Sequence, residues 1–507
     1  MEASIERLPA EGVLSSILRQ IAPALPAARA ARVVVVGCGV RIHFPWAKTE
    51  RTFRTAVERV RDIAREHAGA EIVAADEPFE DPRKLLAFLS QQLASGIDGI
   101  ILVHASYTAG EIGAQMGRWL IDHCVPVLSW SQPEALPGPT AGNQANSLCC
   151  QNFLLQMWRR LGVRYAWMHH AIDRSADEPI ARFLRVAQAV ARLKHGAVLH
   201  AGGSRVTAFY DGEADELAVM RRFGLQYDRM DLEAVFDVAR KVPQRDLDRL
   251  RTALFEDARC RTVDVPVEQA DQTLRLGLAI QRLAAERGYI GVTIKSWPEL
   301  FDCYGCAADG AVSMLNDAGL CTAEEGEMPG LLSSLVMHAL SAGSAVPTMM
   351  DVSVLDEPAN EIGLWHCGAC PTRWLARGAW YQATRHSILE NADRESAVGM
   401  MLEFPLTGGP GTVVRYQSPD CGRCFAFEAT LRPVDPMPMR GNYVAARPMH
   451  RTAGAILSTI MSRGLDHHWS LGFGHLGADV SLFNHFLEVE DIEVVPAGVS
   501  PQKSVGE

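Results

Sequence analysis

The chain has 507 residues, of which 48% are hydrophobic and 21% are charged, and its formal net charge is −11 at pH 7. This length exceeds what one hydrophobic core supports and predicts roughly two to four domains, while the acidic balance argues against nucleic-acid binding. No apolar run reaches membrane-spanning length, which argues against a membrane protein, and the acidic N-terminus lacks a signal-peptide core. With twelve cysteines and no secretion signal, we expect a cytoplasmic protein with reduced thiols.

From Arg32 onward, short β-branched runs alternate with amphipathic helical stretches. Strands are expected at 33–36, 71–74, 97–103 and 126–130, and helices at 52–67, 83–94 and 110–123. This rhythm is typical of a parallel α/β layer. The Pro/Gly-rich segment 132–142 interrupts it and is expected to form a linker or an active-site loop.

A second α/β series follows, and near Pro347 the pattern changes to short strands and turns. In the second series we expect strands at 165–169, 197–201, 227–232 and 289–294, and helices at 178–193 and 268–287. Beyond Pro347 we expect strands at 348–355, 362–367, 412–416 and 424–431, and then a helix at 452–463. The chain is therefore predicted to form an N-terminal α/β domain (1–160), a second α/β domain (161–346) and a β-rich C-terminal domain (347–507).

The first expected strand is followed by Gly37-Cys38-Gly39, which looks like half of a dinucleotide-binding loop. Ile42 occupies the position of that loop's third glycine, and no acidic residue follows convincingly at the expected distance. A strand-to-loop turn is therefore the better interpretation.

The cysteines include three CxxC pairs, Cys303/Cys306, Cys367/Cys370 and Cys421/Cys424. Two such pairs can form a tetrahedral structural zinc site. The pairs are separated by about fifty residues or more, which is longer than a compact zinc ribbon uses, so we favour reduced cysteines in or near the core.

Carboxylates gather in the segment 322–330, directly before an apolar helix expected at 331–340. Ligand sites of α/β proteins lie at such strand-to-helix junctions, although a solvated acidic helix N-terminus explains the same pattern. Further along, Asp351 and His366 each lie in an apolar strand. A buried polar group there must be hydrogen-bonded, paired or bound to a metal.

The C-terminal stretch Gly464-Leu-Asp-His-His-Trp-Ser-Leu-Gly-Phe-Gly-His-Leu-Gly-Ala-Asp479 concentrates histidines and glycines. Imidazoles are common metal ligands, while a His-containing strand that leads into a helix is the alternative. Glu325, Asp351 and His468 together make a mixed oxygen and nitrogen set that suits Mn²⁺, Co²⁺ or Mg²⁺ with open positions.

Over most of its length the chain resembles the L-fucose isomerase / L-arabinose isomerase family of metal-dependent aldose–ketose isomerases. The motifs that carry the resemblance are Glu325-Gly-Glu, Met350-Asp-Val, His366-Cys-Gly, and His467-His468 with Gly474-His475-Leu-Gly-Ala-Asp479. The resemblance implies that Glu325 and Asp351 are metal ligands and acid/base groups. It also implies that His468 is the third ligand, and His366 matches a ligand position on the arabinose isomerase side of the family.

The sequence departs from the family at Glu327, where fucose isomerases tend to have Asp. Glu324 leaves the register of the first ligand open by one residue. Glu325 is preferred because it precedes the glycine, as the family's first ligand tends to.

The resemblance also implies an architecture of two consecutive Rossmann-like parallel α/β domains followed by a β-rich C-terminal domain. It implies a homo-oligomer, a hexamer or trimer, in which the first domain of a neighbouring subunit closes each active site. The expected substrate is a small sugar such as L-fucose, L-arabinose or D-arabinose. Lys295 and Trp297, in Lys295-Ser-Trp-Pro-Glu-Leu, are candidate substrate-binding residues.

An aldose–ketose isomerase moves a proton between C1 and C2 through a cis-enediolate, and carboxylates beside a divalent cation suit this chemistry. Glu325 and Asp351 are expected to share the proton transfers. Another enediolate reaction on a sugar or sugar acid, such as epimerisation, decarboxylation or lysis, fits the same site. A non-catalytic sugar-binding protein is the third alternative, and it needs no metal.

Overall fold

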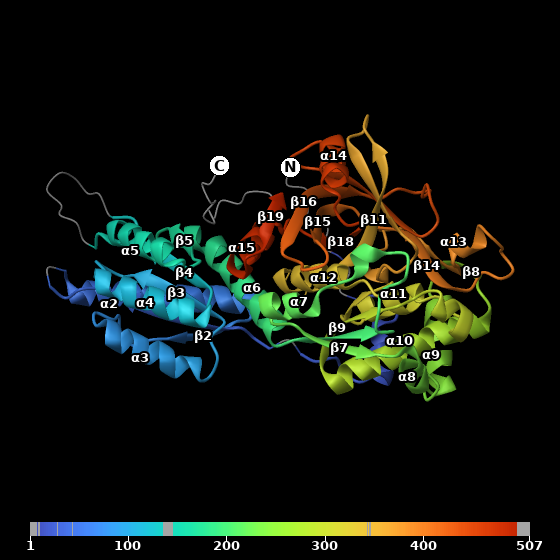
Figure 1. Cartoon of the computed structure of the whole chain (residues 1–507), viewed down its shortest axis with the longest axis horizontal. Helices are drawn as coiled ribbons and strands as arrows, with labels where there is room; N and C mark the ends of the chain where they lie inside the picture. Colours follow the sequence, from blue (N-terminus) through green and yellow to red (C-terminus); the bar gives the residue numbers. More distant parts are fainter. Residues whose placement is uncertain are drawn as a thin grey trace. The chain divides into compact units, whose positions relative to one another are not determined.

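The computed structural model describes residues 8, 11–27, 29–42, 44–134, 145–341, 343 and 346–493. The chain divides into two compact units, the first built mainly from Ala28–Arg192 and the second mainly from Leu193–Val480. Figure 1 shows the elements coloured along the sequence. Most of the expected linker at 132–142 lies outside the described residues. No helix in the described part is long and apolar enough to cross a membrane.

The first unit contains a five-stranded parallel sheet of strand order β2-β1-β3-β4-β5. Its strands are β1 (Arg32–Cys38), β2 (Glu71–Ala74), β3 (Gly99–His104), β4 (Val127–Ser131) and β5 (Ala166–His169). Its helices are α2 (Trp46–Ile63), α3 (Pro82–Leu93), α4 (Gly110–His123), α5 (Ser147–Leu161) and α6 (Asp177–Lys194). The central strands β1 and β3 are continuous apolar runs, as expected for parallel strands that are covered on both faces.

The structure of this unit corrects the expected position of one strand and explains the glycines after β1. The strand expected at 165–169 was placed in the second α/β series, but β5 pairs with β4 at the edge of the first sheet. The glycines after β1 allow close packing of α2, because a Cβ at Gly37 would lie 2.5 Å from Phe53 and one at Gly39 would lie 2.6 Å from Thr49. This packing agrees with a strand-to-loop turn.

The second unit contains a four-stranded parallel sheet of order β10-β9-β6-β7. The strands are β6 (Ala197–Ala201), β7 (Gln226–Met230), β9 (Tyr289–Ile294) and β10 (Cys321–Ala323). The helices of this part are α1 (Ser15–Ile21), α7 (Glu216–Phe223), α8 (Leu232–Ala239), α9 (Gln244–Phe255), α10 (Val267–Arg287), α11 (Asp309–Asp317) and α12 (Met328–Leu340). Every residue of α12 is buried, because this helix packs on β9 and β10 and also on β15 and β18 of the larger sheet described next.

The larger sheet of the second unit has ten strands in the order β19-β16-β15-β18-β11-β12-β17-β14-β13-β8. They are β8 (Cys260–Asp264), β11 (Thr348–Asp356), β12 (Glu361–His366), β13 (Tyr381–Arg385), β14 (Gly399–Pro405), β15 (Gly409–Tyr416), β16 (Arg423–Arg432), β17 (Asn442–Pro448), β18 (His468–Phe473) and β19 (Glu490–Glu493). The α-helices α13 (Ser387–Glu390) and α14 (Ala453–Arg463) belong to this unit, whereas most residues of the last one, α15 (Gly477–Leu487), belong to the first unit. The predicted fold class, two parallel α/β sheets and a β-rich C-terminal region, is confirmed.

Candidate active site

The second unit contains a cavity of about 490 Å³ into which most of the predicted site residues project. Asp351 on β11 and His468, the first residue of β18, are direct partners in the antiparallel pairing of these strands. Partners of this kind project from the same face of a sheet. Glu325 reaches the same cavity from the loop between β10 and α12.

The backbone at Glu325 is held in the left-handed region, with φ of 64°, which is costly for a residue with a side chain. The next residue, Gly326, has φ of 66°, and a Cβ there would lie 2.4 Å from the Ser204 carbonyl oxygen. A glycine is therefore required after Glu325. Such strain is found most often at functional sites, and here it accompanies a carboxylate that lines the cavity.

Both carboxylates lie close to the imidazole of His468, and Glu325, His467 and His468 each have one ligand-type atom within 4.8 Å of the other two. The Nε2 atom of His468 lies 3.2 Å from Oε2 of Glu325 and 3.6 Å from Oδ1 of Asp351. Trp297 Nε1 donates a hydrogen bond of 3.1 Å to the other oxygen of Glu325. The ring of His366 lies 5.7 Å from the ring of His468 and also lines the cavity.

Burial controls the protonation of these groups. It raises the pKa of Glu325 to about 8 and that of Asp351 to about 6, because a carboxylate loses hydration there. It lowers the pKa of His366 to about 3 and that of His468 well below its usual value. The imidazoles are therefore neutral at pH 7, as metal ligands must be.

Among the described residues, Glu325 Oε2, Asp351 Oδ1 and His468 Nδ1 are buried side-chain atoms without a hydrogen-bond partner. Buried carboxylates are costly unless they are paired, hydrogen-bonded or bound to a metal. The oxygen and nitrogen donor set of Glu325, Asp351 and His468 fits a hard or borderline divalent cation such as Mn²⁺.

The other predicted residues have different surroundings. Trp297 lines the cavity, whereas Lys295 is not among the lining residues and forms an ion pair with Glu299. Glu324 also lines the cavity, but Glu325 is the glutamate that lies beside His468. His475 lies in the turn before α15, with its Nδ1 atom 3.9 Å from a Glu428 oxygen.

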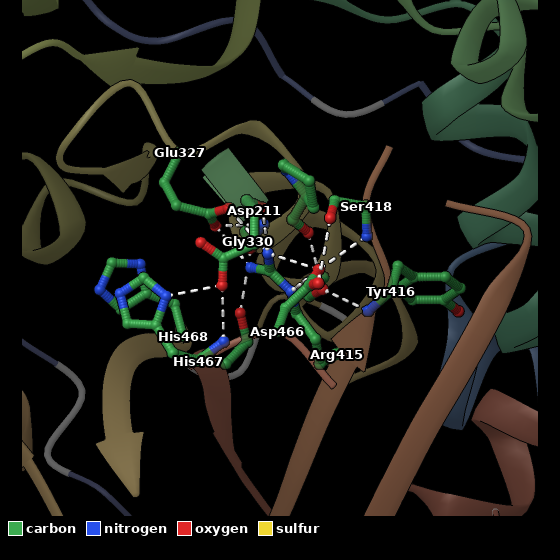
Figure 2. A network of polar contacts seen from close by, with 12 residues as sticks. Asp211, Glu327, Gly330, Arg415, Tyr416, Ser418, Asp466, His467 and His468 are labelled. Carbon is green, nitrogen blue, oxygen red and sulfur yellow. Dashed lines mark hydrogen bonds and ion pairs between the residues drawn. The ribbon is translucent and has the colours of Figure 1, made fainter. Parts of the chain in front are cut away.

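Figure 2 shows a buried network beside the site that the sequence analysis did not anticipate. The guanidinium of Arg415, which is fully buried, donates hydrogen bonds of 2.6 and 2.9 Å to the two carboxylate oxygens of Glu327. It also contacts Asp466 at 2.8 Å. Glu327 accepts a hydrogen bond from the Gly330 amide, so it is the N-cap of α12. The residue that departs from the family pattern is therefore a structural partner of Arg415.

The same network reaches His467 through Asp211. The backbone amide of His467 lies 2.8 Å from Asp211 Oδ2, and its Nδ1 lies 2.7 Å from the same oxygen (Figure 2). Burial is the largest single effect and lowers the pKa of His467, but the hydrogen bond with Asp211 and the attraction of the carboxylates of Asp211, Asp351 and Glu325 together outweigh it, so the net shift of the pKa is upward. His467 thus favours its charged form, in contrast to its neighbour His468.

The CxxC pairs do not meet in the described part of the chain. None of the twelve cysteines forms a disulfide bond, and no group of three or more potential metal-ligating side chains among the described residues contains more than one cysteine. The sequence does contain a signal for the buried ion-pair network, because Arg415 is a charged residue inside the apolar run Val413-Val414-Arg415-Tyr416.

Comparison with known proteins gives the class of the protein. No family model matches the chain. A sulfoquinovose isomerase of Alkalicoccus urumqiensis is 27% identical over 429 residues, which cover 82% of this chain and 90% of that protein. One of Priestia aryabhattai is 22% identical over 431 residues, covering 83% and 90%. One of Clostridium sp. (strain MSTE9) is 27% identical over 260 residues, covering 50% and 57%.

The chain is thus similar to several named sugar isomerases. This similarity identifies it as an enzyme of the isomerase class, an intramolecular oxidoreductase. More closely, these relatives support an aldose–ketose sugar isomerase. Membership of the L-fucose isomerase / L-arabinose isomerase family itself stays a prediction.

Proposed function

We propose that this isomerase is metal-dependent and binds Mn²⁺, with Co²⁺ or Mg²⁺ as alternatives, through Glu325, Asp351 and His468. His366 is an additional candidate ligand. The observation that carries the proposal is that His468 Nε2 lies 3.2 Å from Glu325 and 3.6 Å from Asp351 in one buried cavity. A non-catalytic sugar-binding protein has no need for such a cluster.

In this proposal the residues of the chain have separate tasks. The bound cation supplies Lewis-acid polarisation of the sugar carbonyl. One of the two carboxylates, Glu325 or Asp351, removes the proton from carbon and returns it to the neighbouring carbon. The other carboxylate accepts and returns the hydroxyl proton. Trp297 holds Glu325 in place through its indole hydrogen bond and, with Phe209, supplies an apolar wall that excludes water.

Two substrate classes are candidates. The relatives' names favour sulfoquinovose, a glucose derivative with a sulfonate on C6. The cavity favours a neutral aldose of the L-fucose or arabinose kind, because its described lining includes no Lys or Arg to bind a sulfonate. If sulfoquinovose is the substrate, the residue that binds its sulfonate would come from a neighbouring subunit of the proposed homo-oligomer.

A substrate panel distinguishes the two classes. Purified protein is incubated with Mn²⁺ and sulfoquinovose, glucose, L-fucose, L-arabinose or D-arabinose, and ketose formation is followed by NMR. If a neighbouring subunit completes the site, kcat/KM for sulfoquinovose will exceed that for glucose. If the described cavity is complete, a neutral aldose will be preferred. Epimers or smaller fragments in place of ketose would instead support the other enediolate reactions.

Metal binding is expected to stabilise the folded protein. A ligand that binds only the native state at a hundredfold excess over its Kd adds about 2.7 kcal/mol. We therefore expect a higher Tm after Mn²⁺ is added to EDTA-treated protein, together with recovery of isomerase activity. Full activity with less than a stoichiometric amount of metal, measured by elemental analysis, would refute the proposal.

A further inference from the structure

A second group of ligand-type side chains lines the same cavity, away from Glu325, Asp351 and His468. Asp309 opens α11, Cys367 directly follows β12, and His386 lies between β13 and α13. One ligand atom of each lies within 4.8 Å of the other two. The three residues are between 2% and 7% exposed.

Two of these side chains have polar atoms that are not satisfied within the described structure. Asp309 Oδ1 and His386 Nδ1 are buried without a hydrogen-bond partner. Asp309 Oδ1 lies 3.9 Å from His386 Nε2, which is too long for a hydrogen bond. Two tetrahedral zinc ligands with bonds of about 2.1 Å lie roughly 3.4 Å apart. The carboxylate and the imidazole are therefore spaced more like two ligands of one ion than like a hydrogen-bonded pair.

The carboxylates that line the cavity also favour the binding of a second cation. Its lining includes the carboxylates of Asp309, Glu324, Glu325 and Asp351, and no Lys or Arg is among the described lining residues. One divalent cation at Glu325 and Asp351 balances two of these carboxylates. The other two, Asp309 and Glu324, are also buried, and an ionised carboxylate there is costly unless it is paired or bound to a metal.

We propose that Asp309, Cys367 and His386 bind a second divalent cation, of the zinc class. A thiolate, an imidazole and a carboxylate are the ligand types that zinc takes, and three protein ligands leave one position open toward the cavity. Binding releases the thiol proton of Cys367 to solvent, so that the thiolate sulfur can bind the metal. This site is independent of the proposed function, because the Mn²⁺ site uses other residues and only oxygen and nitrogen donors.

Cobalt titration tests the second site directly, because a Co²⁺–thiolate bond produces a charge-transfer absorption that oxygen and nitrogen ligands do not. Co²⁺ is added to the full-length, metal-free protein under reducing conditions, and the near-ultraviolet spectrum is recorded. We expect the charge-transfer band in the wild-type protein and its loss in Cys367→Ser. The matched control is Cys370→Ser, because Cys370 belongs to the same CxxC pair but does not line the cavity. Its sulfur accepts a hydrogen bond from Thr348.

Further variants separate the possible outcomes. His386→Gln is expected to weaken Co²⁺ binding at this site at least tenfold, and it provides a test if Cys367→Ser fails to fold. His468→Gln should remove one cobalt equivalent but keep the band, so the two metal sites can fail separately. A band that is absent from the wild type, or that survives in Cys367→Ser, overturns the proposal. A raised KM in the Asp309→Asn and His386→Gln variants with unchanged cobalt binding also overturns it and assigns these residues to sugar hydroxyls.

Discussion

Replacement of Asp351 by Asn is expected to abolish isomerisation and to leave the fold intact. The variant loses a proposed metal ligand and one of the two proton-transfer groups, and a general acid or base alone contributes about 10²–10⁴-fold. We therefore expect kcat to fall by about a thousandfold or more. Burial raises the pKa of Asp351 to about 6, so its charge does not favour folding, and the Tm of the metal-free variant should not fall.

The matched control is Ser353→Ala, which changes another cavity-lining residue of β11 without removing a carboxylate. This variant should keep kcat close to the wild-type value. Metal content and kcat are measured together for both variants. Wild-type activity in Asp351→Asn would contradict the assigned role of this residue.

Replacement of Arg415 by Met is expected to cause the largest loss of stability. The guanidinium is fully buried and pairs with Glu327 and Asp466, so its removal leaves two buried carboxylates without a cation. Breaking a buried pair in this way costs about 3–5 kcal/mol. Arg415→Lys should be intermediate, because an ammonium cannot form the two parallel hydrogen bonds to Glu327. Chemical denaturation followed by circular dichroism measures the loss.

Arg19→Met provides the control for this prediction. Arg19 forms an ion pair of 2.8 Å with Glu11, and both side chains are more than half exposed, at 60% and 52%. An exposed pair contributes less than about 1 kcal/mol, so this variant should unfold almost as the wild type does. Equal losses in the two arginine variants would show that burial of the Arg415 network has no special effect. In Arg415→Met, the further change Glu327→Gln should recover part of the stability, because it removes one unpaired charge.

The strands that were predicted correctly are mostly those with an apolar or β-branched run. Strands β1, β3 and β9 carry such runs and are buried in parallel sheets. In contrast, β8 has the short sequence Cys-Arg-Thr-Val-Asp, is largely exposed, and forms a strand because it pairs with β13 more than a hundred residues later. The strand β5 was recognised but assigned to the wrong series, because nothing local in its sequence says which sheet it extends.

Three features can be predicted from the sequence alone: the α/β alternation, the change to a β-rich region near Pro347, and the residue types of the candidate metal site. These features follow from hydrophobic periodicity and from the cost of burying polar groups, which act locally. Which of these groups meet depends on how the chain folds in three dimensions. The pairing of β11 with β18 sets Asp351 opposite His468, and the folds around α11 and β13 bring Asp309 and His386 to Cys367. Such contacts depend on which distant strands become neighbours, and local periodicity carries no information about that choice.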